Sequence, residues 1–366
     1  MASQLQRHDG VLDLMIDRQP STPTGAAAAS RAATAGDLAA PPRQQRWLVA
    51  VVRAYLELIK ARLVLLVVAT AAVGFLLAPN AKLALTRLVV TLAGTFLAAA
   101  GSMALNERIE AARDGLMERT RARPVPAGTI GPRTATGFGI TVATVGLLTL
   151  ALGASPLTAA LGLAVVLVYT LVYTPLKTRT PMCTLAGAAC GAIPPMMGWT
   201  ATGAGLGYGA WLLAGVLFLW QIPHFLALAW LYRDDYRRGG FRMLPVVEPS
   251  GILTGSAAVL YSLALVPVGI LAALGGITSW RFAAGALVLG AALTALALQL
   301  ATRRSNAAAR RVFLATLAYL PLLLGMMVAD RKAPVPARPG FAAVGVQVTP
   351  SPTTLTHPRA TLVTAR

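Results

Sequence analysis

The sequence predicts an all-α membrane protein with nine transmembrane helices. Only 12% of its 366 residues are charged, about half the roughly 25% that is usual in soluble domains, whereas 56% are hydrophobic. A chain of this length cannot bury so much apolar surface inside one soluble core. Apolar runs close to the ~20 residues that cross a bilayer recur nine times along it. These features exclude a soluble enzyme, a disordered protein and a disulfide scaffold.

The nine predicted spans follow one another between two polar ends. The fifth is the weakest, because it carries several glycines and the pair Pro194-Pro195, which membrane helices tolerate where neighbours satisfy the backbone. The ends, residues 1–46 and 330–366, have no apolar period and are predicted to be disordered tails around one domain at 47–329. No signal peptide or transit peptide is expected in the first tail, which lacks an apolar run and carries four acids. The spans cover residues 55–78, 87–105, 135–154, 157–174, 183–202, 210–231, 252–275, 282–300 and 311–329.

Basic residues predict the orientation of these spans. Counted with Arg87 and Arg311 at the edges of their spans, the loops after the second, fourth, sixth and eighth spans hold 16 Lys and Arg residues, against 3 in the other loops. Since cytoplasmic loops carry the excess of positive charge, we expect the N-terminus inside and the C-terminus outside. Topology alone is also a sufficient explanation for any single arginine in these loops.

Acidic residues concentrate after the second and sixth spans, on the same predicted face of the membrane. In the first of these stretches, Asn106, Glu110 and Asp114 are spaced four residues apart and share one face of a helix that extends from the second span. Two carboxylates and an amide are hard oxygen ligands of the kind that hold Mg²⁺ together with substrate phosphates. The sequence therefore predicts a diphosphate site with catalytic residues Asn106, Glu110 and Asp114; a solvated, salt-bridged helix end is the alternative.

Basic side chains lie close to this first acidic stretch. Arg119, Arg121 and Arg123 follow it directly, and Lys177 and Arg179 lie in the loop after the fourth span. Arginine is suited to bidentate contacts with phosphate. We expect all five to bind the diphosphate of a substrate.

The second acidic stretch contains Asp234 and Asp235, flanked by Arg233 and Tyr236. Asp235 is predicted to be catalytic, and both acids are candidate ligands of a second Mg²⁺, beside Glu110 and Asp114 in the first site. Arg233, Asp234 and Tyr236 are predicted to contact substrate. Alone, this stretch is weaker evidence than the first.

His224 is the single histidine of the predicted membrane domain. An ionisable residue inside the membrane is a candidate functional residue. Three roles stay open for it: a haem ligand that binds substrate, a base, or a packed neutral imidazole.

Together these stretches resemble the UbiA superfamily of intramembrane prenyltransferases, and within it the protohaem IX farnesyltransferase (haem O synthase) branch. The resemblance covers about residues 47–329. It rests on the order and spacing of five segments: Asn106–Pro124, Tyr173–Pro181, Gly187–Trp199, Phe218–Phe225 and the run from Asp235 to Pro245.

The resemblance implies nine helices around a central cavity, capped by cytoplasmic loops after helices 2 and 6. It implies transfer of farnesyl from farnesyl diphosphate to a vinyl group of haem B, with addition of water, giving haem O and diphosphate. Mg²⁺ bound to the diphosphate is the implied cofactor, with haem B as substrate. A bacterial inner membrane, no nucleic-acid partner, and a downstream haem-modifying enzyme or terminal oxidase are also expected.

Two alternatives to this interpretation remain. A related prenyltransferase could act on an aromatic or quinone precursor, although the adjacent acids Asp234 and Asp235 follow the haem-type pattern. A multi-spanning transporter is less favoured, because its ionisable sites would lie near the bilayer midplane. Ala112 stands where relatives often carry an acid, which leaves the number of Mg²⁺ ions at the first site open.

Overall fold

A computed structural model describes residues 43–79 and 85–332 of the chain. The predicted tails lie outside the described residues, except for residues 43–46 and 330–332 at their inner ends. By their contacts, the described residues divide after Val51: residues 43–51 belong to one unit, and residues 52–79 and 85–332 to a second. Of the first unit, only the beginning of helix α1 is described.

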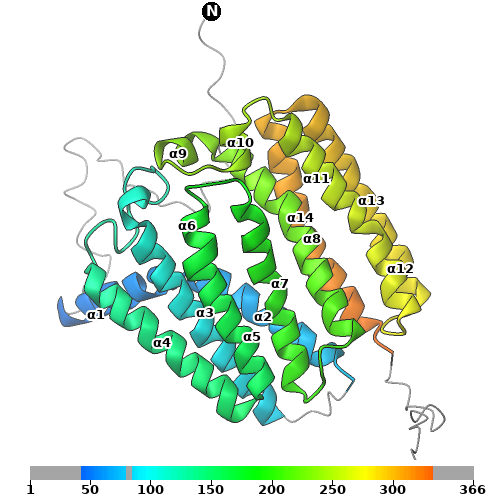
Figure 1. Ribbon diagram of the computed structural model, residues 1–366, viewed down its shortest axis with the longest axis horizontal. Helices are drawn as coiled ribbons and strands as arrows, with labels where there is room; N and C mark the ends of the chain where they lie inside the picture. The colour runs from blue at the N-terminus through cyan, green and yellow to red at the C-terminus, as the bar shows by residue number, and fades with distance from the viewer. Residues whose placement is uncertain (1–42, 80–84, 333–366) are drawn as a thin grey trace, which may run out of the picture. The chain divides into compact units, whose positions relative to one another are not determined.

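The described residues are mostly helical, which confirms the all-α class (Figure 1). They contain an isolated β-bridge between Thr278 and Arg331 and no named strand. The helices are α1 (Arg43–Leu58), α2 (Ala61–Leu77), α3 (Leu85–Asp114), α4 (Pro132–Gly153), α5 (Pro156–Leu167), a π-helix (Val168–Tyr173), α6 (Thr174–Leu176), α7 (Cys183–Ala201), α8 (Tyr208–Leu231), α9 (Arg233–Arg238), α10 (Leu244–Val247), α11 (Ile252–Ala264), α12 (Val266–Leu274), α13 (Trp280–Arg303) and α14 (Asn306–Ala329).

Local sequence explains where several helices begin. Ser155, Ser279 and Ser305 each accept a backbone N–H of the following helix through the side-chain oxygen, which satisfies a donor that the first turn leaves free. Pro156 follows the first of these caps, where its missing N–H costs nothing. Lys60 separates α1 from α2 with a left-handed backbone (φ 52°), so the predicted first span is broken there.

The described part of the chain is a multi-pass membrane protein. Seven of its helical segments are long and apolar enough to cross a bilayer, and α1 and α2 add an eighth if the pair, bent by 53°, counts as one span. Helix α7 has the position of the predicted fifth span, but with its glycines, threonines and prolines it is not among these segments. The predicted count of nine is therefore approached, not confirmed.

Helix α7 is the most buried of the long helices and packs against α2, α5 and α8 (Figure 1). Small residues permit this close packing, as is common between helices in membranes. A Cβ atom at Gly198 would lie 1.8 Å from the carbonyl oxygen of Ala71 on α2. Helix α3 approaches α4 in the same way: a Cβ at Gly101 would lie 2.5 Å from the backbone nitrogen of Ala143.

Candidate diphosphate site

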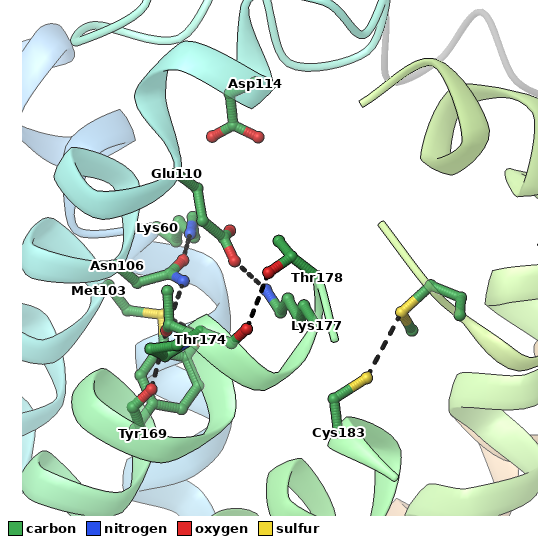
Figure 2. A network of polar contacts seen from close by, with 12 residues as sticks. Lys60, Met103, Asn106, Glu110, Asp114, Tyr169, Thr174, Lys177, Thr178 and Cys183 are labelled. Carbon is green, nitrogen blue, oxygen red and sulfur yellow. Dashed lines mark hydrogen bonds and ion pairs between the residues drawn. The ribbon is translucent and has the colours of Figure 1, made fainter. Parts of the chain in front are cut away.

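Helix α3 carries the three polar residues that the sequence places on one face. It continues nine residues beyond the predicted end of the second span, to Asp114. Asn106, Glu110 and Asp114 follow one another along the helix and are all buried, at 1%, 5% and 1% exposure (Figure 2). Burial of two carboxylates and an amide is costly unless each is hydrogen-bonded or paired, so partners are expected.

Each of these three residues meets a basic side chain from a different segment. The pairs are Lys60 Nζ–Asn106 Oδ1 at 2.8 Å, Lys177 Nζ–Glu110 Oε1 at 2.8 Å, and Arg123 Nη1–Asp114 Oδ2 at 2.6 Å. Figure 2 shows the first two pairs, where Lys177 and Lys60 approach α3 from separate parts of the chain. The structure thus brings two of the predicted phosphate-binding residues, Lys177 and Arg123, to the predicted acids.

The segment that carries Lys177 has an unusual backbone. The π-helix Val168–Tyr173 precedes it, and such segments are frequent at functional sites. Beyond it, Thr174 accepts a hydrogen bond from Asn106 Nδ2 at 3.0 Å and donates to the carbonyl of Tyr169 at 2.8 Å. The Lys177 ammonium also lies 4.4 Å from the ring centroid of Tyr173, within range of a cation–π contact.

Electrostatics hold Lys177 in its charged form. Burial is the largest single influence and disfavours the ammonium, but the attraction and hydrogen bonding of Glu110, together with Tyr169 and Tyr236, outweigh it and raise the pKa of Lys177 above its usual value. Lys177 is therefore a cation at neutral pH, as contact with a phosphate requires.

The second acidic stretch forms helix α9, and its two acids differ. Asp235 is 8% exposed, accepts a hydrogen bond from the backbone N–H of Glu118 at 3.3 Å, and pairs with Arg238. Asp234 points into solvent, where its 64% exposed side chain pairs with Arg237 at 2.6 Å. Only Asp235 is therefore brought to the loop that follows α3.

The end of α3 and the loop that follows it contact the segment after α8 at several points, as the predicted cap requires. Arg113 donates to the carbonyl of Gly239 at 3.2 Å. The guanidinium of Arg119 lies 4.9 Å from the ring centroid of Tyr232 and 5.9 Å from that of Tyr236. The central cavity beneath these loops stays a prediction.

The remaining predicted phosphate-binding residues are less engaged. Arg121 and Arg179 are exposed in their loops. Arg233 donates to the carbonyl of Trp230 at 2.7 Å and to the side chain of Asn306 at 2.8 Å, which ties α9 to the beginning of α14. These contacts fix Arg233 at the end of α8, and its contact with substrate stays a prediction.

His224 packs between α8 and α14. Its Nδ1 lies 2.9 Å from Thr316 Oγ1, and its ring stacks on Trp220 and Phe313 at centroid distances of 5.1 and 5.0 Å. Because the Thr316 hydroxyl donates to the carbonyl of Phe313 at 2.6 Å, its oxygen accepts from His224 Nδ1–H. These contacts match the packed neutral imidazole. Because Nδ1 is bound to Thr316, a haem iron would have to bind the lone pair of Nε2.

Three residues of the site were missed by sequence reasoning: Lys60, Glu107 and Arg238. Lys60 was the detectable one, since it is a lone lysine beside an apolar run. Glu107 is fully buried and accepts the Val125 N–H at 3.1 Å through Oε1. The sequence does not predict this burial, because a shift of one position along a helix turns a side chain from the loop toward solvent.

The donor set fits a magnesium ion that is shared with a diphosphate. Within residues 43–79 and 85–332, no three His, Cys, Asp or Glu side chains converge into a ready-made metal cage. Mg²⁺ is commonly held by one or two carboxylates plus substrate phosphates, not by such a cage. Glu110 and Asp114 supply that number of carboxylates, with basic side chains beside them for the phosphates.

Comparisons with known proteins agree with this site. The model of the UbiA prenyltransferase family matches residues 67–320. A protoheme IX farnesyltransferase of Solibacter usitatus is 38% identical over 288 residues, covering 76% of this chain and 99% of the relative. One from Anaeromyxobacter sp. is 43% identical over 268 residues, covering 73% and 90%. The human mitochondrial protoheme IX farnesyltransferase is 40% identical over 276 residues, covering 75% of this chain and 62% of the human protein.

Solved structures show the same fold at low sequence identity. A digeranylgeranylglyceryl phosphate synthase superposes with a TM-score of 0.65 at 15% identity, covering 76% of this chain and 98% of the other. A UbiA homolog from Aeropyrum pernix K1 gives 0.59 at 19% identity, covering 73% and 97%. One from Archaeoglobus fulgidus, bound to GPP and Mg²⁺, gives 0.51 at 18% identity, covering 75% and 99%. From the matched sequence and the shared fold, the chain belongs to the UbiA prenyltransferase family.

Proposed function

We propose that the protein transfers a farnesyl group from farnesyl diphosphate to a vinyl group of haem B, giving haem O and diphosphate. The observation that carries this proposal is the 38–43% identity to relatives named protoheme IX farnesyltransferase, over about three quarters of the chain. The paired acids and bases at the end of α3 supply what the diphosphate end of the reaction needs.

The reaction balances with water as the third reactant. The bond between C1 of farnesyl and the diphosphate oxygen breaks, and diphosphate leaves with the electron pair. C1 bonds to the terminal carbon of the vinyl group, which leaves a cation on the carbon next to the porphyrin. Water adds its oxygen to that carbon and loses a proton, which gives the hydroxyethylfarnesyl side chain.

The basic residues stabilise the departing diphosphate. Lys177 and Arg123 lie at the acids of α3 and offer charged donors to its oxygens, as preorganised donors do for developing negative charge. We assign the same role to Arg119, Arg121 and Arg179. Magnesium would supply further charge neutralisation of the leaving group when bound.

Glu110 and Asp114 would hold that magnesium at the first site, Asp235 would hold a second ion, and Asn106 would orient the diphosphate through its amide. Asp235 is favoured over Asp234 as the second-site ligand, because Asp235 alone is buried and contacts the loop after α3. A UbiA homolog of the same fold was solved with GPP and Mg²⁺ bound, which supports Mg²⁺ together with a prenyl diphosphate as the ligands of the site. Tyr236 and His224 are proposed substrate contacts, His224 through Nε2.

We place the protein in a bacterial inner membrane with its N-terminus in the cytoplasm. The excess of Lys and Arg in the loops that carry the site supports this orientation. Diphosphate and metal would then reach the site from the cytosol. A haem-modifying enzyme or a terminal oxidase would use the product downstream.

The decisive experiment is mass spectrometry of haems after incubating the purified protein with farnesyl diphosphate, Mg²⁺ and haem B. We expect the hydroxyethylfarnesyl product from the wild type and none from Asp114→Ala or Asp235→Ala, with both variants still folded in the membrane. A parallel incubation replaces haem B with 4-hydroxybenzoate. Transfer only to the benzoate would refute the haem substrate.

A further inference from the structure

A cluster of arginines lies where α13 ends and α14 begins. Both helices are long and apolar enough to cross a bilayer, so the turn that joins them lies at the membrane surface. Four arginines stand within nine residues of the chain there, and all but Arg310 are exposed. We call these four residues the basic turn: Arg303, Arg304, Arg310 and Arg311.

No acid balances the charge of the basic turn. The sequence contains no Asp or Glu from residue 249 to residue 329. The ion pairs of residues 43–79 and 85–332 include none of these arginines. Two of them bind neutral acceptors instead: Arg304 Nε donates to the Ala301 carbonyl at 3.2 Å, and Arg311 Nη1 donates to Gln299 Oε1 at 3.3 Å. The charge is therefore available to an anion from outside the chain.

The backbone of Arg304 is a second, independent observation. Its φ of 46° lies in the left-handed region, where helices usually end on glycine because a side chain is strained there. Ser305 follows it and accepts the N–H of Ala308 at 3.2 Å, so α14 begins at once and the turn is held tightly. Strained residues of this kind concentrate at binding sites, which points to a role for the Arg304 side chain.

The chemistry of the basic turn fits a phosphate group at the membrane surface. Arginine makes bidentate contacts with phosphate oxygens. Clusters of Lys and Arg directly beside membrane helices attract the headgroups of anionic lipids. The bilayer also holds those headgroups at the level of the turn, at a local concentration that a dissolved phosphate does not reach. A lipid headgroup is therefore favoured over a free phosphate ion.

We propose that the basic turn binds the headgroup of an anionic phospholipid, which supplies the negative charge that this part of the chain lacks. None of its four arginines belongs to the candidate diphosphate site, and the lipid site does not depend on the proposed reaction.

A contact joins the basic turn to helix α9. Arg233 of α9 donates through Nη1 to Asn306 Oδ1 at 2.8 Å, and Asn306 is the first residue of α14. Figure 1 shows the beginning of α14 at the same end of the helices as α9. A headgroup that fixes the basic turn therefore also fixes the anchor of α9, the helix that carries Asp235.

Native mass spectrometry of the full chain in a nonionic detergent, titrated with phosphatidylglycerol, tests the site. We expect saturable binding, about tenfold or more tighter than that of phosphatidylcholine, because choline neutralises the phosphate charge. Inorganic phosphate at the same concentration as the lipid should not displace it. Equal affinities for the two lipids, or displacement by equimolar phosphate, would overturn the proposal.

A triple variant tests the arginines, with a charge-matched triple as control. The first combines Arg303→Gln, Arg304→Gln and Arg311→Gln, and its affinity for phosphatidylglycerol should fall about fivefold per arginine, roughly a hundredfold in all. The control replaces three other exposed arginines of the same predicted membrane face, each from a different segment and none in an ion pair: Arg62, Arg108 and Arg133.

The control separates a site from the general positive charge of this face. Salt screens isolated surface charges beyond a Debye length of about 8 Å, so the control should bind phosphatidylglycerol within about twofold of the wild type. Equal losses in the two triple variants would mean that the lipid follows surface charge alone, and would overturn the proposal.

Hydrogen exchange of residues 233–238 measures the connection to α9. Phosphatidylglycerol should slow this exchange in the wild type and in the control, but not in the triple variant of the basic turn. Exchange that is the same with and without the lipid would refute the effect on α9.

Arg304→Gly keeps the proposal testable if the triple variant does not fold. Glycine adopts a φ of 46° without strain, so this variant should unfold at the temperature of the wild type or above it. Its affinity for phosphatidylglycerol should nevertheless fall about fivefold, because one charge is lost. A stable Arg304→Gly variant with unchanged affinity would count against the proposal.

Discussion

Replacing Lys177 with methionine tests the central ion pair of the site. The change removes the ammonium but keeps most of the length and apolar character of the side chain. It leaves Glu110 with its carboxylate buried and without its 2.8 Å partner. It also removes the cation above the Tyr173 ring.

The structure sets the expected magnitude. Breaking a buried ion pair by removing one partner costs about 3–5 kcal/mol when the other charge stays buried. Lys177 and Glu110 keep side-chain exposures of 13% and 6%, which places this pair near the lower limit, at about 3 kcal/mol. Glu110→Gln in the Lys177→Met background removes the stranded charge, so the double variant should regain about 2 kcal/mol of that loss.

Equilibrium unfolding in mixed micelles, titrated with a denaturing detergent, measures all four members of this double-mutant cycle. We expect the effects of the two substitutions to be non-additive by more than 1 kcal/mol, as contacting residues are. Additive effects, or a Lys177→Met variant as stable as the wild type, would refute the reasoning and mean that Glu110 is solvated in the absence of ligand.

Three further outcomes follow from other contacts. Glu107→Ala leaves the buried N–H of Val125 without an acceptor and should destabilise the protein by about 1–3 kcal/mol, whereas Glu107→Gln retains an acceptor oxygen and should lose less, as thermal unfolding can show. Gly198→Ala forces α7 away from α2, because the new Cβ would lie 1.8 Å from the Ala71 carbonyl oxygen; overpacking costs typically 1–3 kcal/mol, and a variant with unchanged unfolding would argue against this contact. Hydrogen bonds from Ser250 and from the N–H of Leu253 hold the pKa of Glu248 below its usual range, so its contribution to stability is present above the unfolded-state pKa and is lost as pH falls through the folded-state value. Glu248→Gln should therefore flatten the acid limb of a stability–pH curve and leave its neutral region less stable.

The helical face of α3 shows how far local rules reach. The spacing of Asn106, Glu110 and Asp114 fixes their common face once the segment is helical, because each residue turns the chain by a constant angle. The composition of the spans likewise decides that they enter a bilayer, since hydropathy is a property of each segment alone. Both predictions were confirmed by the structure.

Helix α7 marks the limit of such rules. Its glycines and prolines make it the weakest span by composition, yet the structure buries it more completely than the other long helices. That burial depends on neighbours such as α2, whose backbone approaches within reach only because Gly198 has no side chain. Hydropathy along one segment contains no information about which surfaces face it.

What the sequence alone determined is therefore the membrane class, most acids and bases of the candidate diphosphate site, and the helix face that carries the first acids. What only the tertiary structure decided is which partners meet. Two adjacent residues differ in burial: Asp235 is buried at the cap, whereas Asp234 lies in solvent. Lys60 reaches Asn106 across 46 positions of the chain. The physical reason is that helical periodicity is local, whereas the pairing of buried charges depends on the packing of segments distant in sequence, where an unpaired charge is too costly to remain.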